Sequence, residues 1–217
     1  MPEAELILAV DSSARADARL ALLDRSGQLV EARVELTGIV ALVTAVAQLV
    51  ETAAGRLSQV VVARGPGSYI GVRAGMSMAL GVAQGRGLPL HQVGSLEVMA
   101  ATLDPQDCEL LVLAGAGRGG VYGQRFKGNP GRTRERGWQP VGSSYALRPA
   151  DSWPPAWEGV DLLLSSPELD PAPGLRRAIP RLSMLEGLAQ LAGCDLGLAS
   201  AYDLLSADYG VRGEEPS

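Results

Sequence analysis

Apolar residues in the first part of the chain alternate between strand-like and helix-like spacing. Leu6 to Val10 and Ala18 to Leu23 are nearly continuous apolar runs, whereas Gln28 to Leu36 alternates apolar and polar positions. These runs predict a buried strand, a second strand that runs back beside it, and a third strand with one face exposed to solvent. Between Gly38 and Ala54 the apolar residues instead recur every three or four positions, which predicts a helix.

A glycine-rich turn joins the next predicted strand to the next helix. Gln59 to Ala63 reads as a strand, and Gly65-Pro66-Gly67-Ser68 follows it and leads into a helical run that reaches Arg86. Glycine permits backbone conformations that a Cβ opposes, and Ser68 suits the N-cap of a helix. The turn therefore either presents backbone N–H groups to an anion or lets the helix pack closely.

The rest of the chain predicts two lobes. A strand at Leu88 to Val93 and a short helix at Leu96 to Leu103 complete an α/β order that ends in a linker, Asp104 to Asp107. Beyond it, Leu110 to Gly115 repeats the first apolar run at a shift of 104 positions, so that Asp11 falls on Gly115. This weak internal repeat divides the chain into an N-terminal lobe, residues 1–104, and a smaller, degenerate lobe, residues 105–217.

Fewer elements are predicted in the second lobe. Gly137 to Val141 and Val160 to Ser165 read as strands, and Arg181 to Ala192 has helical spacing. The tail after residue 209 is expected to fray.

The two long predicted helices carry little charge. Glu51 is the one charged residue between Gly38 and Gly55, and Arg73 and Arg86 are the charged residues of the second helix. Such surfaces are uncommon on monomers, which favours a helix-on-helix interface with another chain; the alternative is that the second lobe covers both helices. The interface residues expected are Val43, Val46, Val50, Gly71, Arg73, Gly75, Met76 and Ala79.

Composition excludes several classes of protein. The net charge of -5 argues against unaided binding of nucleic acid, because neutralising phosphates needs clustered Lys and Arg. Cys108 and Cys194 lack the paired spacing of a disulfide framework, and one histidine, His91, cannot supply a multi-histidine metal site. The N-terminus shows no signal peptide, and the predicted helices have too few apolar residues to span a membrane. A cytoplasmic location is therefore expected.

Four segments resemble the bacterial TsaB (YeaZ) family: Leu6 to Ser13, Gly65 to Arg73, Gly94 to Glu97 and Tyr209 to Arg212. The glycine block is the most specific of them, although Ile70 stands where the family usually has Thr. The resemblance implies a two-lobed actin-like fold, a duplicated ribonuclease-H-like α/β unit with mixed sheets flanked by helices.

The same resemblance implies a function. A family member is a non-catalytic subunit in the formation of threonylcarbamoyladenosine on tRNA beside the anticodon. It forms a homodimer, or a heterodimer with the catalytic TsaD paralogue, through its first two helices. A TsaE-type ATPase joins the larger complex, tRNA is bound only indirectly, and ATP and a metal are expected in the partner subunit rather than in this chain.

Nucleotide chemistry in this chain is a separate question. Actin-like ATPases hold Mg-nucleotide with a carboxylate at the end of the first strand of each lobe. Asp11 occupies that place in the first lobe, but its repeat partner Gly115 has no side chain to ligate a metal. We therefore predict that Asp11 is a hairpin-turn residue and that there are no catalytic or metal-ligating residues. The residues expected to contact any nucleotide are Asp11, Ser12, Gly65, Gly67 and Ser68.

Two enzymatic alternatives remain open at this point. A small actin-like ATPase or sugar-kinase relative would bind Mg-ATP and lose turnover in Asp11→Asn. A glycoprotease-type peptidase would need Ser68 as its nucleophile, and Ser68 has no adjacent base in the sequence. The peptidase is the less favoured of the two.

Overall fold

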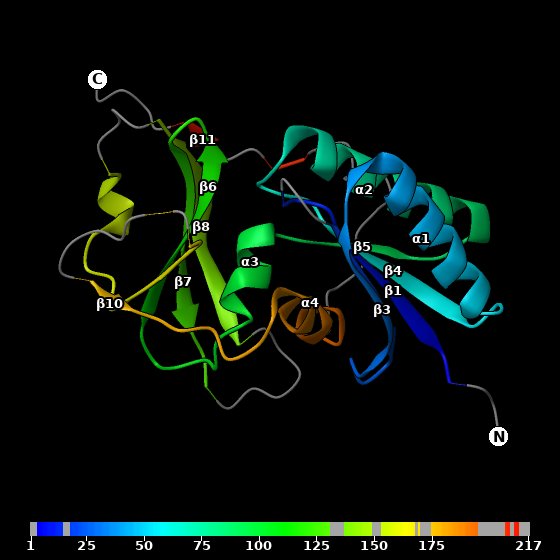
Figure 1. Ribbon diagram of the computed structural model, residues 1–217. Helices are drawn as coiled ribbons and strands as arrows, with labels where there is room; N and C mark the ends of the chain where they lie inside the picture. The colour runs from blue at the N-terminus through cyan, green and yellow to red at the C-terminus, as the bar shows by residue number, and fades with distance from the viewer. Residues whose placement is uncertain are drawn as a thin grey trace.

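The computed structural model describes residues 4–14, 18–130, 137–148, 153–167, 169, 175–194, 207–208 and 211–212. Two mixed β-sheets stand apart, with helices over and between them (Figure 1). Each sheet is the centre of one lobe, so the expected two-lobed α/β fold is confirmed.

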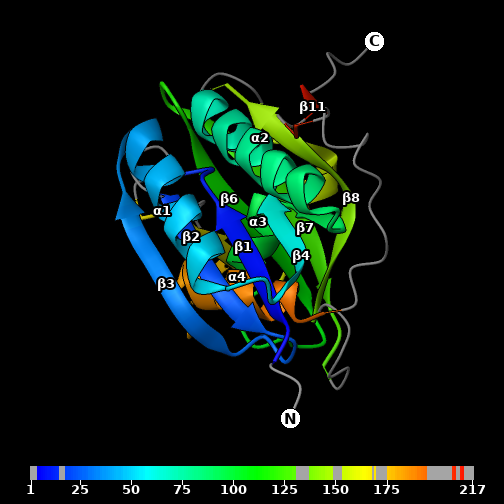
Figure 2. The ribbon, with the colours of Figure 1, turned by 90° about the vertical axis from the view of Figure 1, so that its right-hand side faces the viewer.

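The first lobe has a five-stranded sheet in the order β3-β2-β1-β4-β5. The three strands of the predicted meander pair antiparallel, and β4 and β5 run parallel to β1. The strands are β1 (Leu6–Asp11), β2 (Ala18–Asp24), β3 (Leu29–Leu36), β4 (Leu57–Ala63) and β5 (Leu90–Val93). Two helices, α1 (Gly38–Thr52) and α2 (Tyr69–Arg86), lie side by side over one face of this sheet (Figure 2).

β1 shows why this sheet is the core of the lobe. All six of its residues are buried, because alternate side chains of a strand point to opposite faces and both faces are covered. Leu8 and Val10 pack in the cluster that includes α1 and α2, whereas Ile7 and Ala9 pack in a cluster on the other face.

The second lobe has a six-stranded sheet in the order β10-β9-β6-β7-β8-β11. Its antiparallel β6-β7-β8 meander and the parallel β9 beside β6 repeat the arrangement of the first sheet, so the predicted internal repeat is structural. The strands are β6 (Glu109–Gly117), β7 (Gly120–Gly128), β8 (Trp138–Leu147), β9 (Leu162–Ser165), β10 (Arg176–Arg177) and β11 (Val211–Arg212). A short 3-10 turn, η1 (Pro155–Trp157), precedes β9.

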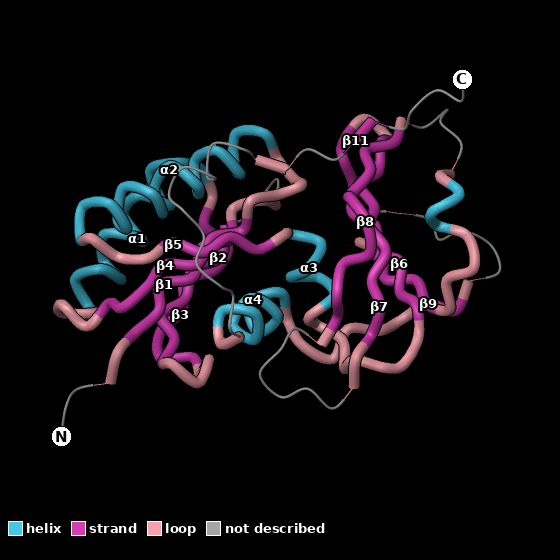
Figure 3. Tube along the Cα trace, turned by 180° about the vertical axis from the view of Figure 1, so that it is seen from behind, coloured by secondary structure: helices cyan, strands magenta, loops and turns pink. Residues whose placement is uncertain are grey.

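Two helices, α3 (Ser95–Ala100) and α4 (Met184–Ala192), lie between the sheets and contact each other (Figure 3). α3 follows the first sheet in sequence, yet Leu96 and Ala100 pack in the core of the second lobe. α4 follows the second sheet, yet Leu188 and Leu191 pack against the first. The boundary at residues 104 and 105 stays a prediction. The core of each lobe includes a helix that lies on the other side of this boundary in the sequence.

Most predicted elements of the second half are confirmed with shifted ends. The strand predicted at Gly137 to Val141 extends to Leu147, and the helix predicted from Arg181 begins at Met184, where Ser183 caps it. The expected frayed tail, residues 210–217, lies outside the described residues apart from β11. No helix in the described ranges is long and apolar enough to span a membrane.

Candidate pairing face and interlobe cleft

The glycines that open α2 are required by close packing against the end of β1. A Cβ on Gly71 would lie 2.1 Å from the carbonyl oxygen of Ser12, and one on Gly67 would lie 2.4 Å from that of Ser13. The Ser12 hydroxyl donates to the Gly71 carbonyl at 2.7 Å, and the Ser68 N–H donates to the Ser13 carbonyl at 2.8 Å. Of the two interpretations of this turn, close helix packing is therefore observed directly.

Ser68 has the predicted capping role. Its hydroxyl oxygen accepts a hydrogen bond from the Gly71 N–H at 3.4 Å, at the first turn of α2. This bond satisfies one of the amide groups that a helix leaves unpaired at its start.

Asp11 is fully buried and its carboxylate is already occupied. One oxygen accepts from the Ser13 N–H at 3.0 Å and from the Ser13 hydroxyl at 2.6 Å, and the other lies 3.5 Å from Nη1 of Arg19. A carboxylate two residues before its backbone donor forms an Asx turn, which supports the interpretation of Asp11 as a turn residue.

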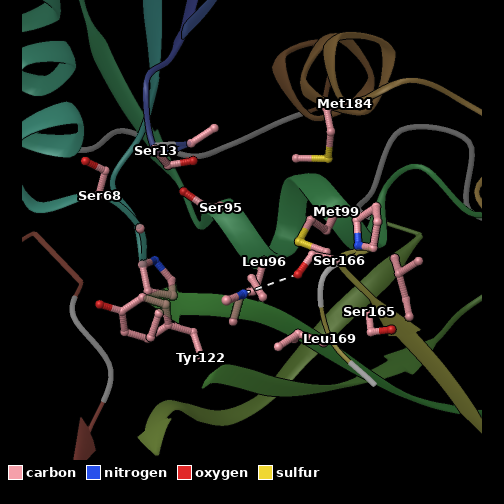
Figure 4. A pocket seen from close by; sticks show the side chains of 18 of the residues that line it. Ser13, Ser68, Ser95, Leu96, Met99, Tyr122, Ser165, Ser166, Leu169 and Met184 are labelled. Carbon is pink, nitrogen blue, oxygen red and sulfur yellow. Dashed lines mark hydrogen bonds between the residues drawn. The ribbon is translucent and has the colours of Figure 1, made fainter. Parts of the chain in front are cut away.

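A cleft of about 1420 Å³ separates the lobes. Figure 4 shows the serine hydroxyls that several elements contribute to it: Ser13 and Ser68 from the first lobe, Ser95 at the start of α3, and Ser165 and Ser166 near the end of β9. Its apolar lining includes Leu96, Met99, Tyr122, Leu169 and Met184.

The cleft separates the predicted nucleotide-binding residues into two groups. Gly67 and Ser68 line it, whereas Asp11, Ser12 and Gly65 do not. The described lining residues include no Asp, Glu, His or Cys, and the described part of the chain holds no cluster of three such residues suited to a metal. Nucleotide binding by this set stays a prediction.

Among the described residues, three buried side-chain polar atoms lack a hydrogen-bond partner, one of them the indole nitrogen of Trp157. The hydroxyl of Ser95 is unpaired beside the cleft, and Nδ1 of His91 is unpaired in β5. His91 is buried and lies outside the cleft lining.

The predicted interface needs correction at four residues. Val46, Gly75, Met76 and Ala79 are buried in the core of their own lobe and offer no surface to a partner. The side of α2 that carries Gly75 faces the end of β1, because a Cβ on Gly75 would lie 2.1 Å from the Ser12 hydroxyl. Helical spacing alone could not show which apolar face turned inward. Val50 and Gly71 are half-buried, and Val43 and Arg73 are exposed.

The exposed large apolar side chains of α1 and α2 make up a different set, of which the sequence analysis named only Val43. Its members are Ile39, Val40 and Val43 on α1, and Tyr69 and Ile70 at the start of α2. Val40 is 81% exposed and Ile70 is 67% exposed. We call these five residues the outer face. The second lobe leaves it uncovered, so the alternative that this lobe shields both helices is wrong for these side chains.

Small residues make up part of the remaining exposed side of α2. Ser77, Gly81 and Gly85 are exposed, and a Cβ on either glycine would meet nothing within 4 Å. Arg73 lies over the ring of Tyr69, with its guanidinium carbon 4.1 Å from the ring centroid. A cation held over an aromatic ring is partly ordered before any partner arrives.

The ionisable groups with a shifted pKa belong neither to the outer face nor to the cleft lining. Burial, followed by the nearby charge of Asp161, raises the pKa of the Cys108 thiol, so the reactive thiolate is disfavoured. Hydrogen bonds from Ser183 lower the pKa of Glu186 at the start of α4.

Three comparisons with known proteins agree. The family model described as TsaD, tRNA N6-adenosine threonylcarbamoyltransferase, matches residues 33–135. The Bacillus subtilis (strain 168) tRNA threonylcarbamoyladenosine biosynthesis protein TsaB is 44% identical over 66 residues, a segment that covers 30% of this chain and 29% of that protein.

Among solved structures, YeaZ from Pseudomonas aeruginosa is similar with a TM-score of 0.63 at 20% identity, covering 87% of this chain and 91% of that one. A second structure, described as having similarity to the peptidase YEAZ from Pseudomonas aeruginosa, gives the same TM-score and identity over 90% of its length. Together these matches support the resemblance of this chain to the TsaB (YeaZ) family.

The family-model match includes the glycine block that is the most specific part of the resemblance. The TsaD family-model match begins in β3 and runs into the second lobe, so it includes α1, the glycine turn, α2 and α3. The solved YeaZ structures, at 20% identity, establish the fold of this chain and not its activity.

Proposed function

We propose that this chain is the non-catalytic TsaB-type subunit in the formation of threonylcarbamoyladenosine on tRNA, and that it pairs with a TsaD-type catalytic subunit through the outer face. The observation that carries the proposal is the exposure of five large apolar side chains on two adjacent helices. The match to the Bacillus subtilis TsaB protein supplies the process.

The outer face has the chemistry of a helix-to-helix contact. Each large apolar side chain that becomes fully buried contributes about 1.5–3 kcal/mol relative to its exposed state. Because Gly81 and Gly85 have no neighbour near a Cβ position, a partner helix can approach the backbone of α2 closely. Arg73, stacked on Tyr69, lies in the same turn as Ile70 and is exposed beside the outer face.

A non-catalytic role is supported by the state of Asp11. Its carboxylate is hydrogen-bonded to Ser13 and lies near Arg19, and Gly115 stands at the equivalent end of β6. Phosphoryl transfer depends on positioned metal ions and charge neutralisation, and these two positions offer no pair of free carboxylates. The proposal therefore assigns ATP and the metal to the partner subunit, with a TsaE-type ATPase in the larger complex.

The acidic net charge supports indirect contact with tRNA, through the partner. In the absence of that partner the same outer face pairs two copies of this chain as a homodimer. The proposed place of action is the cytoplasm, where tRNA is modified.

The pairing face is tested with Val40→Arg and Ile70→Arg. Both side chains are largely exposed, so the variants keep the fold, while a buried charge in the interface weakens binding of a TsaD-type subunit by about 30-fold or more. Isothermal titration measures the affinity, and light scattering after gel filtration measures the homodimer. Circular dichroism checks that each variant is folded.

The matched control is Ile179→Arg, because Ile179 is 81% exposed but lies in the second lobe. It is expected to bind as the unaltered chain does. Wild-type affinity of Val40→Arg and Ile70→Arg would remove the outer face from the proposal. The ATPase alternative is tested on the isolated chain with Mg-ATP, where turnover that depends on Asp11 would contradict a non-catalytic role.

A further inference from the structure

One residue near the end of the chain, Asp208, contacts both lobes. Its N–H donates to the carbonyl of Arg64 at 2.9 Å, immediately before the glycine turn of the first lobe. The hydroxyl of Ser144, on β8 of the second lobe, lies 2.9 Å from each of its carboxylate oxygens. We call Arg64, Gly65, Ser144 and Asp208 the Asp208 junction.

Gly65 has its own role in this junction. Its φ of +100° is in the left-handed region, and a Cβ there would lie 2.5 Å from the carbonyl oxygen of Asp208. A side chain would displace Asp208 even if the backbone strain were accepted. Ser144 is 4% exposed, so its hydrogen bonds to Asp208 are shielded from water. The close contact with Asp208 therefore explains why residue 65, the first of the glycine turn, is a glycine.

The residues that flank Asp208 are held by different lobes. Ala207 packs against the cluster between α1, α2 and the first sheet. On the other side, β11 pairs with β8 at Tyr145 and Ala146, next to Ser144, and Figure 1 shows it along the edge of the second sheet. The chain end is thus anchored in the first lobe before the junction and in the second lobe after it.

We propose that the Asp208 junction fixes the opening of the interlobe cleft and the position of the first turn of α2. The turn begins four residues after Gly65, and its residues Tyr69 and Ile70 belong both to the cleft lining and to the outer face. Movement of Arg64 relative to Ser144 therefore changes the width of the cleft and the placement of those two side chains together. This is a conformational device and goes beyond the pairing function proposed above.

The remaining connections between the lobes form a second, separate group. Among the described residues they include the contact between α3 and α4, the hydrogen bond from the Arg181 N–H to the Thr102 carbonyl at 3.0 Å, and that from the Trp138 indole N–H to the Leu103 carbonyl at 3.1 Å. A chain with the junction broken keeps these contacts. It consequently stays folded and moves about α3 and α4, rather than separating into two lobes.

The test uses Ser144→Ala and Asp208→Ala in the full chain. Hydrogen–deuterium exchange of residues 64–70 is expected to accelerate about tenfold in each variant, because a buried hydrogen bond to a charged group is lost. Small-angle scattering is expected to show a larger radius of gyration, while exchange in β1 and β4 stays at the wild-type rate. Neither readout requires a partner, so failure of the pairing proposal leaves this test intact.

The matched control is Asp24→Ala, which removes another Ser–Asp hydrogen bond, that of Ser26, within a single lobe. It is expected to leave exchange at residues 64–70 and the radius of gyration unchanged. Wild-type exchange and scattering in Ser144→Ala would overturn the proposal, as would acceleration spread evenly over both sheets. If Asp208→Ala fails to fold, Ser144→Ala alone decides the outcome.

Discussion

At the scale of single residues, the glycines of one motif are required for different reasons. Gly65 makes room for Asp208, Gly67 for Ser13 and Gly71 for Ser12, and each of these contacts is to a backbone carbonyl oxygen. Backbone atoms cannot rotate away as a flexible side chain can. Gly81 belongs to the same helix as Gly71 but has open space at its Cβ position. The four positions are therefore not equivalent, although the residue type is the same.

These differences predict opposite effects of two alanine substitutions in α2. Gly71→Ala is expected to lower the free energy of unfolding by about 1–3 kcal/mol, because its Cβ overlaps the Ser12 carbonyl. Gly81→Ala is expected to raise it by about 0.5–1 kcal/mol, because an exposed helical glycine costs backbone entropy. Urea denaturation of both variants measures the two values. Equal effects would show that the overlap at Gly71 relaxes without cost.

Asp24 provides a prediction about pH. The hydroxyl of Ser26 and the N–H of Gln28 donate to its carboxylate at 2.6 and 3.0 Å, and these bonds hold its pKa below the ordinary value. The lowered pKa means that this stabilisation is present above the unfolded-state pKa and is lost as pH falls through the native pKa. Asp24→Ala is therefore expected to destabilise the chain at neutral pH and progressively less in acid. Urea denaturation over a pH series measures this, and a penalty independent of pH would contradict it.

At the scale of elements, α1 and α2 each have two apolar sides with different roles. The inner sides fill the core of the first lobe, and Leu42 and Leu49 are almost fully buried there. The outer sides carry Val40 and Ile70, which no described residue covers. Apolar residues on both sides of a helix are typical of a helix with a neighbour on each side, and this pattern underlies the proposed pairing.

α4 shows how an element can stabilise a distant part of the sequence. It packs on β1 and β2, and a Cβ on Gly27, in the β2–β3 turn, would lie 3.1 Å from the carbonyl of Ala189. Leu188→Ala removes a fully buried side chain at this contact, so we expect it to lower the free energy of unfolding by about 2–5 kcal/mol.

The control for α4 is Leu29→Ala in β3, where the side chain is 52% exposed and the expected change is within about 0.5 kcal/mol. Chemical denaturation compares the two leucines directly. A loss at Leu188 no larger than that at Leu29 would mean that α4 contributes little to the first lobe.

At the scale of the whole molecule, the two lobes are joined by exchange of helices. α3 completes the core of the second lobe and α4 completes that of the first, and the Asp208 junction adds a third connection near the chain end. The cleft is lined by residues of both lobes, including residues of α3. Its width therefore depends on contacts that are far apart in sequence.

This exchange predicts the behaviour of an isolated first lobe. A fragment of residues 1–104 retains the first sheet but loses α4, which exposes the apolar cluster around Ile7, Ala9 and Val61. We expect the fragment to lack cooperative unfolding and to bind a hydrophobic dye, whereas the full chain unfolds cooperatively. A sharp thermal transition of the fragment, followed by circular dichroism, would show instead that the sheet is stable without α4.

The order of strands and helices, the repeated hairpin and the capping of α2 by Ser68 were determined by the sequence alone, because periodicity and turn chemistry are local properties. The TsaB resemblance likewise depended on four short segments, and mainly on the block around the glycine turn. The face of α2 that turns inward was decided by Ser12, a residue of a distant strand end. The placement of α4 on the first sheet and the contact of Asp208 with Gly65 also join residues far apart in sequence, and such contacts leave no periodic signal in the chain. These three features are decided only in the tertiary structure, where apolar surfaces from distant parts of the sequence compete for burial.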